Sequence, residues 1–80
     1  MKKKINILKL FRVARAMTPQ ELSKITSIPS FRIFEYEHGY IPIPRKDWDM
    51  FLKVFEFSKK DERSLVRIIK PEINIEQEKT

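Results

Sequence analysis

Hydrophobic residues recur every three or four positions in five stretches of this chain, which is the spacing of helices that bury one face. The pattern predicts helices over residues 5–16, 18–26, 29–38 and 45–57, and a fifth helix that opens after Ser58 and ends at Pro71. One glycine against five prolines argues against a turn-rich β architecture. We therefore predict an all-α fold of five helices.

The start of the second helix carries the sharpest local signal. Thr18 can cap this helix, Pro19 suits its first position, and Glu21 completes a capping box. From this register we expect Leu22 and Ile25 to point into the core.

The third helix, 29–38, follows a short polar break and stops at Gly39, the single glycine of the chain. A left-handed C-terminal cap is favoured at that position. We expect Ile33 and Tyr36 to lie on the inner face of this helix. The segment 40–44 holds two prolines and is predicted to be extended.

The later apolar positions are more numerous than one helix face can bury. The core is expected to take Trp48, Phe51, Leu52 and Phe55, whereas Leu65, Ile68 and Ile69 form the stripe of the fifth helix. The tail, 71–80, alternates isoleucines with polar residues, which fits either a frayed end or a short strand. We expect a dimer contact to draw on Phe57, Leu65, Ile69, Ile73 and Ile75.

The net charge of +6 is concentrated at one end of the chain. Residues 1–16 hold six basic side chains and no acid, whereas residues 17–80 hold 11 of each sign. The basic arm, 1–4, precedes the predicted domain, 5–70, and such a patch suits nucleic acid or a membrane surface. Without cysteine, and without an apolar run near the roughly 18 residues of a membrane span, we expect a cytoplasmic protein.

No group of residues suggests catalysis. The chain has no cysteine nucleophile, a single histidine (His38), no glycine-rich phosphate loop and no paired carboxylates on an inward face. A thiolate metal site is excluded, and a site built on His38 would need several carboxylates around it. We expect no enzymatic activity, no metal and no cofactor.

Several short motifs follow one another between residues 8 and 69. They are Leu8-x-x-Phe11-Arg12, Ala16-Met17-Thr18, Glu21-Leu22-Ser23, the apolar Ile28 and Ile33, and Glu37-x-Gly39. Together they resemble the Cro/C1-type (XRE-like) helix-turn-helix family. The resemblance implies a DNA-binding transcriptional regulator, acting as a homodimer on an operator, of a kind common on phages and mobile elements. It also implies a partly buried ion pair between Arg12 and Glu37.

The resemblance places the helix 29–38 in the DNA major groove. Its base-reading candidates are Ser30, Phe31, Phe34 and Glu35. The phosphate-contact candidates are Lys2, Lys3, Lys4, Gln20, Arg32, His38, Arg45 and Lys46. The chain departs from the family at Pro19, where glutamine is usual, at Ser27, where glycine is usual, and in a longer loop after Gly39.

The two phenylalanines of this helix leave three interpretations open. Phe31 could contact thymine methyl groups while Glu35 accepts from cytosine N4, although Arg, Lys, Asn and Gln are the usual base readers. Phe31 and Phe34 could instead anchor a protein partner, as in an antirepressor, antitoxin-like or inhibitor module. Alternatively, one of them could belong to the core. A membrane-surface function for the basic first helix conflicts with the burial of its apolar face.

Overall fold

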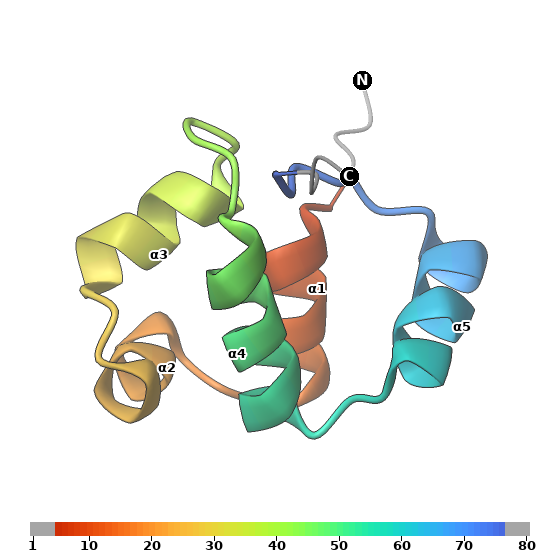
Figure 1. Cartoon of the computed structure of the whole chain (residues 1–80), viewed down its shortest axis with the longest axis horizontal. Coiled ribbons are helices and arrows are strands. Elements are labelled where there is room, and N and C mark those ends of the chain that lie inside the picture. The colour runs from red at the N-terminus through yellow and green to blue at the C-terminus, as the bar shows by residue number, and fades with distance from the viewer. Residues whose placement is uncertain (1–4, 77–80) are drawn as a thin grey trace.

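The computed structural model describes residues 5–76, and over that range it contains five helices (Figure 1). They are α1 (Ile7–Ala14), α2 (Pro19–Thr26), α3 (Ser30–Glu37), α4 (Arg45–Phe55) and α5 (Lys59–Ile69). α1 and α4 lie in the middle, with α2 and α3 on one side and α5 on the other. The predicted all-α class is confirmed. None of these helices is long and apolar enough to cross a membrane.

The first four predicted helices extend past the observed ones, by four residues at α1, by two at α3 and α4, and by one at α2. α1 begins at Ile7 rather than at residue 5 because the Asn6 side chain caps it, accepting from the backbone N–H of Leu8 at 2.8 Å. After α1 and α4 the chain turns through residues of positive φ, Ala16 at 54° and Glu56 at 59°. The predicted helix ends at 16 and 57 are therefore too late.

Capping boxes open both α2 and α5. At the predicted start of α2, the Thr18 hydroxyl accepts from the backbone N–H of Glu21 at 3.1 Å, and the Glu21 carboxylate accepts from the backbone N–H of Thr18 at 2.8 Å. Ser58 and Asp61 repeat the arrangement at α5. In each box the hydrogen bond from the backbone N–H of the cap residue lowers the pKa of the carboxyl below its usual value.

The core lies where α1 and α4 meet, and it is aromatic. The ring of Phe11 lies 5.4 Å from that of Trp48, centroid to centroid, and the core also buries the predicted Phe51, Leu52 and Phe55. The expectation for Ile25 is wrong, because that side chain is 60% exposed. The inner face of α2 follows the i, i+4 line from Leu22 to Thr26, whose buried hydroxyl donates to the Leu22 carbonyl at 2.7 Å.

Helix α5 is attached to the rest of the domain more loosely. It has no fully buried residue, and its contacts with the core come from the half-buried Leu65 and Val66. Of the predicted stripe of this helix, Leu65 is half-buried, whereas Ile68 is 73% exposed and Ile69 is 44% exposed. One hydrogen bond ties α5 to α4: the indole N–H of Trp48 donates to the Glu62 carboxylate at 2.9 Å.

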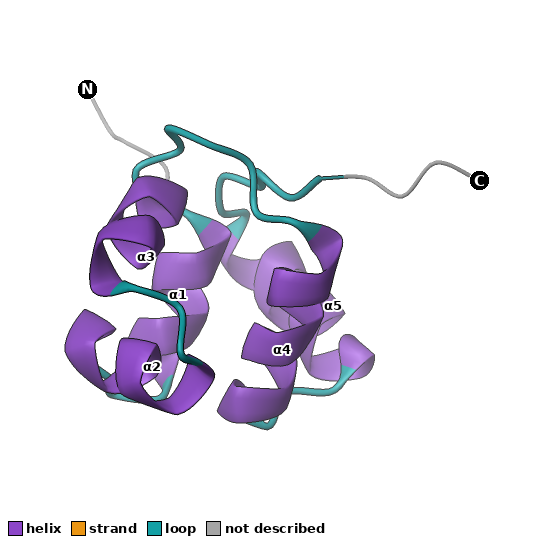
Figure 2. Cartoon of the chain, turned by 60° about the vertical axis from the view of Figure 1, so that its left-hand side comes forward, coloured by secondary structure: helices purple, strands orange, loops and turns teal. Residues whose placement is uncertain are grey.

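The tail over residues 71–76 is an extended segment held by backbone hydrogen bonds to two distant parts of the chain (Figure 2). Glu72 accepts from the backbone N–H of Ile7, at the start of α1, and donates to the Ile5 carbonyl. Ile43, just before α4, donates to the Asn74 carbonyl and accepts from the backbone N–H of Glu76. Over this range the tail is neither frayed nor a regular strand, because each contact is an isolated parallel bridge.

Candidate nucleic-acid interface

Helix α3 follows α2 after a turn over residues 27–29. Ser27 turns the chain in the left-handed region at φ 64°, a conformation that glycine adopts without steric cost. Ile28 packs against the core at the turn, and the predicted Ile33 and Tyr36 are buried. The opposite face of α3 therefore points to solvent.

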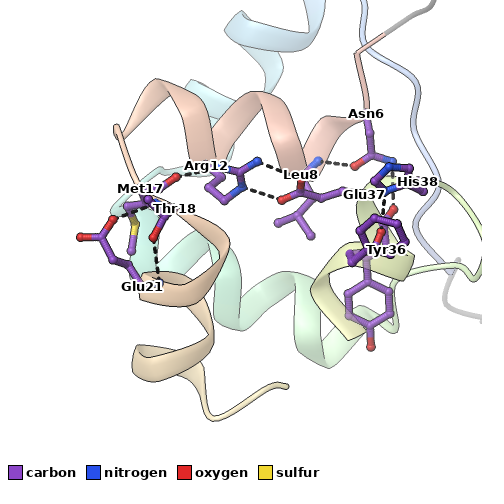
Figure 3. A network of polar contacts seen from close by, with 10 residues as sticks. Asn6, Leu8, Arg12, Met17, Thr18, Glu21, Tyr36, Glu37 and His38 are labelled. Carbon is purple, nitrogen blue, oxygen red and sulfur yellow. Dashed lines mark hydrogen bonds and ion pairs between the residues drawn. The ribbon is translucent and has the colours of Figure 1, made fainter. Parts of the chain in front are cut away.

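An ion pair fastens the end of α3 to α1, as the family resemblance implies (Figure 3). The Arg12 Nε donates to one Glu37 carboxylate oxygen at 2.6 Å and the Nη2 donates to the other at 2.9 Å, so the ion pair is bidentate. The remaining Nη1 donates to the Met17 carbonyl at 2.7 Å. The pair thereby joins α1, the turn before α2, and α3.

A second set of polar contacts holds Tyr36. The amide of Asn6 donates to the Tyr36 backbone carbonyl at 3.2 Å (Figure 3), and the Tyr36 hydroxyl donates to the Asp47 carboxylate at 2.7 Å. Burial, and then the hydrogen bond to Asp47, raise the pKa of Tyr36 to about 12. α3 is thus linked to the cap of α1 and to α4.

The outer face of α3 exposes both phenylalanines. Phe31 is 61% exposed and Phe34 is 50% exposed, so the interpretation that one of them belongs to the core is wrong. Ser30 is also exposed, and Glu35 is half-buried. Arg32 lies over the Phe31 ring, 5.6 Å from its centroid, and pairs with Glu35 at 3.5 Å. This pair neutralises the one cationic side chain of α3.

Three rings form an aromatic cluster at the C-terminal end of α3. His38 stacks on Phe34 with ring centroids 3.9 Å apart, and Tyr40 lies 6.0 Å from Phe34 and 5.7 Å from His38. The His38 Nδ1–H donates to the Phe34 carbonyl at 2.9 Å. Tyr40 was not among the predicted site residues. The loop following Gly39 (φ 71°) brings it back to α3, a contact that helical periodicity does not reveal.

A cavity of about 510 Å³ opens between α1, α2 and α3. It brings together several of the predicted site residues with one that the sequence analysis left out, Lys9. Its walls include Lys9, Gln20, Ser30, Phe31, Phe34 and His38. The arrangement offers an ammonium group, an amide and a hydroxyl beside two exposed aromatic rings.

The other phosphate-contact candidates are not brought to this cavity. Lys2, Lys3 and Lys4 lie outside the described residues. Arg45 pairs with Asp49 at 3.8 Å and faces a different groove, beside α5. Lys46 is exposed at the start of α4. Within residues 5–76, the positive charge next to the outer face of α3 therefore comes mainly from Lys9.

The dimer candidates divide into two groups. Leu65 and Ile75 are half-buried against the core. The ring of Phe57 packs on that of Phe11, with ring centroids 4.9 Å apart, and the Arg15 guanidinium lies over it. The expectation that Phe57 forms a dimer contact is therefore not supported, because its ring already packs within the chain. Ile69 and Ile73 remain exposed, together with Ile68.

No cluster of three or more histidine or acidic side chains within residues 5–76 is arranged to hold a metal ion. Comparisons of the chain with models of protein families, with curated proteins and with solved structures found no match.

Proposed function

We propose that the chain is a sequence-specific DNA-binding regulator of the Cro/C1 type, which uses α3 as its recognition helix. The observation that carries this proposal is the position of α3, which follows α2 after a short turn, is bound to α1 through Arg12 and Glu37, and exposes its outer face. The DNA major groove is about 12 Å wide and admits one helix. A helix held in this way can enter the groove without losing its orientation.

The contacts would follow from the side chains around the cavity. Lys9, Gln20 and Ser30, which line the cavity, would donate hydrogen bonds to DNA phosphates. The lysines of the basic arm, 2–4, would add sequence-independent affinity. Readout would be largely apolar, with Phe31 against thymine methyl groups and Glu35, once released from Arg32, accepting from cytosine N4.

Two copies would bind together. One recognition helix reads few base pairs, and two copies related by a twofold axis would read two half-sites separated by one or more DNA turns. The exposed Ile68 and Ile69 of α5 supply an apolar surface for this contact, on the side of the domain away from α3 (Figure 1). The operator would then be an inverted repeat.

Selection from a randomised duplex pool at physiological salt tests the proposal. The wild type should enrich a motif of two half-sites, and the Phe31→Ala/Phe34→Ala variant should enrich that motif less strongly. Ile25→Ala is the matched control, since it truncates an equally exposed apolar side chain on α2, outside the cavity. Replacing Lys2, Lys3 and Lys4 by Ala should weaken binding to all sequences and lower the salt slope. Absence of an enriched motif would refute base readout by α3.

A second function is favoured by the neutralised surface of α3. Arg32 is engaged by Glu35, and Phe34, His38 and Tyr40 form an exposed aromatic cluster, the composition of a protein-binding hot spot. The same chain would then capture a protein, as an inhibitor module does. In that case the Phe31→Ala/Phe34→Ala variant would abolish capture, whereas the lysine substitutions in the arm would have little effect.

A further inference from the structure

A second cavity, of about 470 Å³, lies on the other side of the domain from α3, between α5, the start of α4 and the tail. Its apolar wall comes from Ile7, Val66, Ile73 and Ile75. Residues of α1, α5 and the tail therefore meet around one apolar space. Its volume falls within the range of pockets that hold small organic ligands.

Cationic side chains line the same cavity. Arg63 and Arg67 are one helical turn apart on α5, and Arg45, which pairs with Asp49, lies at the start of α4. Among residues 5–76, the ion pairs that the structure shows do not include Arg63 or Arg67. Like charges at this spacing repel, so an anion between them would be favourable.

Two acidic residues, Glu62 and Glu76, also line the cavity, and within residues 5–76 neither forms an ion pair with Arg63 or Arg67. Glu62 accepts the hydrogen bond of the Trp48 indole, which directs its carboxylate toward α4. Glu76 is tied by its backbone to Ile43, and its carboxylate forms no ion pair with the arginines in the described structure. The cavity thus combines an apolar wall with two guanidinium groups that have no ion-pair partner within residues 5–76.

We propose that this cavity binds a small amphipathic anion, an apolar body that carries a single carboxylate or similar acidic group. The body would lie against Val66, Ile73 and Ile75, and the anionic group would accept hydrogen bonds from Arg63 and Arg67. The inference rests on this cavity alone and not on DNA binding. A ligand there would leave α3 accessible.

Titration of the full chain with decanoate, followed by the methyl resonances of Val66, Ile73 and Ile75, tests the proposal. Decyltrimethylammonium and decanol are matched probes of equal apolar length, one cationic and one neutral, and inorganic phosphate is a probe with charge alone. Decanoate should shift these methyl resonances saturably. Each of the other probes should bind about tenfold more weakly or worse, because charge-assisted hydrogen bonds are lost or the apolar contact is absent.

Two variants sharpen the test. Arg63→Gln/Arg67→Gln should weaken decanoate binding by about tenfold or more. Lys60→Gln removes a charge from the same helix outside the cavity and should leave binding unchanged. Because Arg63 and Arg67 are exposed, the double variant should keep the wild-type unfolding temperature.

Three outcomes would overturn the proposal. Equal binding of decanol and decanoate would show that the cavity is an apolar patch without selectivity for an anion. Equal binding of phosphate and decanoate would show that it is an anion site without selectivity for an apolar body. Methyl shifts produced by duplex DNA or by raising the protein concentration, with none from decanoate, would assign the surface to nucleic acid or to a second copy of the chain.

Discussion

The ion pair between Arg12 and Glu37 should be strongly coupled. The two side chains are 11% and 7% exposed, and the guanidinium holds both carboxylate oxygens at 2.6 and 2.9 Å. Removing one partner leaves the other charge nearly buried and unpaired, which costs about 3–5 kcal/mol. Arg12→Met and Glu37→Met should therefore each lower the unfolding temperature by at least about 12 °C, at about 4–8 °C per kcal/mol for a domain of this size.

The double variant should lose much less than the sum of the two single losses, because two apolar side chains of similar length then face each other. A double-mutant cycle measured by urea unfolding should give a coupling free energy of about 2–3 kcal/mol. The exposed pair of Arg32 and Glu35, at 3.5 Å, is the control and should couple by no more than about 0.5 kcal/mol. Additive losses for Arg12 and Glu37 would refute the argument that the pair fastens α3 to α1.

Three further predictions concern the frame around the site. The raised pKa of Tyr36 adds to the free energy of unfolding an amount that is complete below pH 10 and is lost as the pH rises through 12. Tyr36→Phe should therefore reduce the loss of stability over this pH range in unfolding experiments. An equal loss in both proteins would contradict the assigned pKa. Ser27→Gly should raise the free energy of unfolding by about 0.5 kcal/mol, because the strain of a non-glycine residue in the left-handed region exceeds the entropy that glycine adds to the unfolded state. A lower urea midpoint of unfolding would contradict this. Glu62→Ala should leave the Trp48 indole N–H without its acceptor and lower the free energy of unfolding by about 1–3 kcal/mol. Amide hydrogen exchange in α5 should then be faster. Unchanged exchange there would show that this hydrogen bond does not hold α5.

Much of the α2–α3 unit was predictable from residues close together in sequence. Thr18, Pro19 and Glu21 specify the start of α2 because a cap and its partners lie within one helical turn. Gly39 marks the end of α3 because a left-handed residue is needed there. The exposure of Phe31 and Phe34 could not be settled in the same way, since periodicity in an eight-residue helix leaves its rotation open.

The sequence by itself determined the number of helices, the starts of α2 and α5 at Thr18 and Ser58, and the aromatic core of α4, because these depend on local spacing and on hydrophobic periodicity. Tertiary structure decided which sides of α2 and α5 are buried, leaving Ile25 and Ile68 in solvent. It also decided the docking of the tail on Ile43 and the gathering of Arg45 with Arg63. These features come from contacts between distant segments, whose geometry is set only when the helices pack.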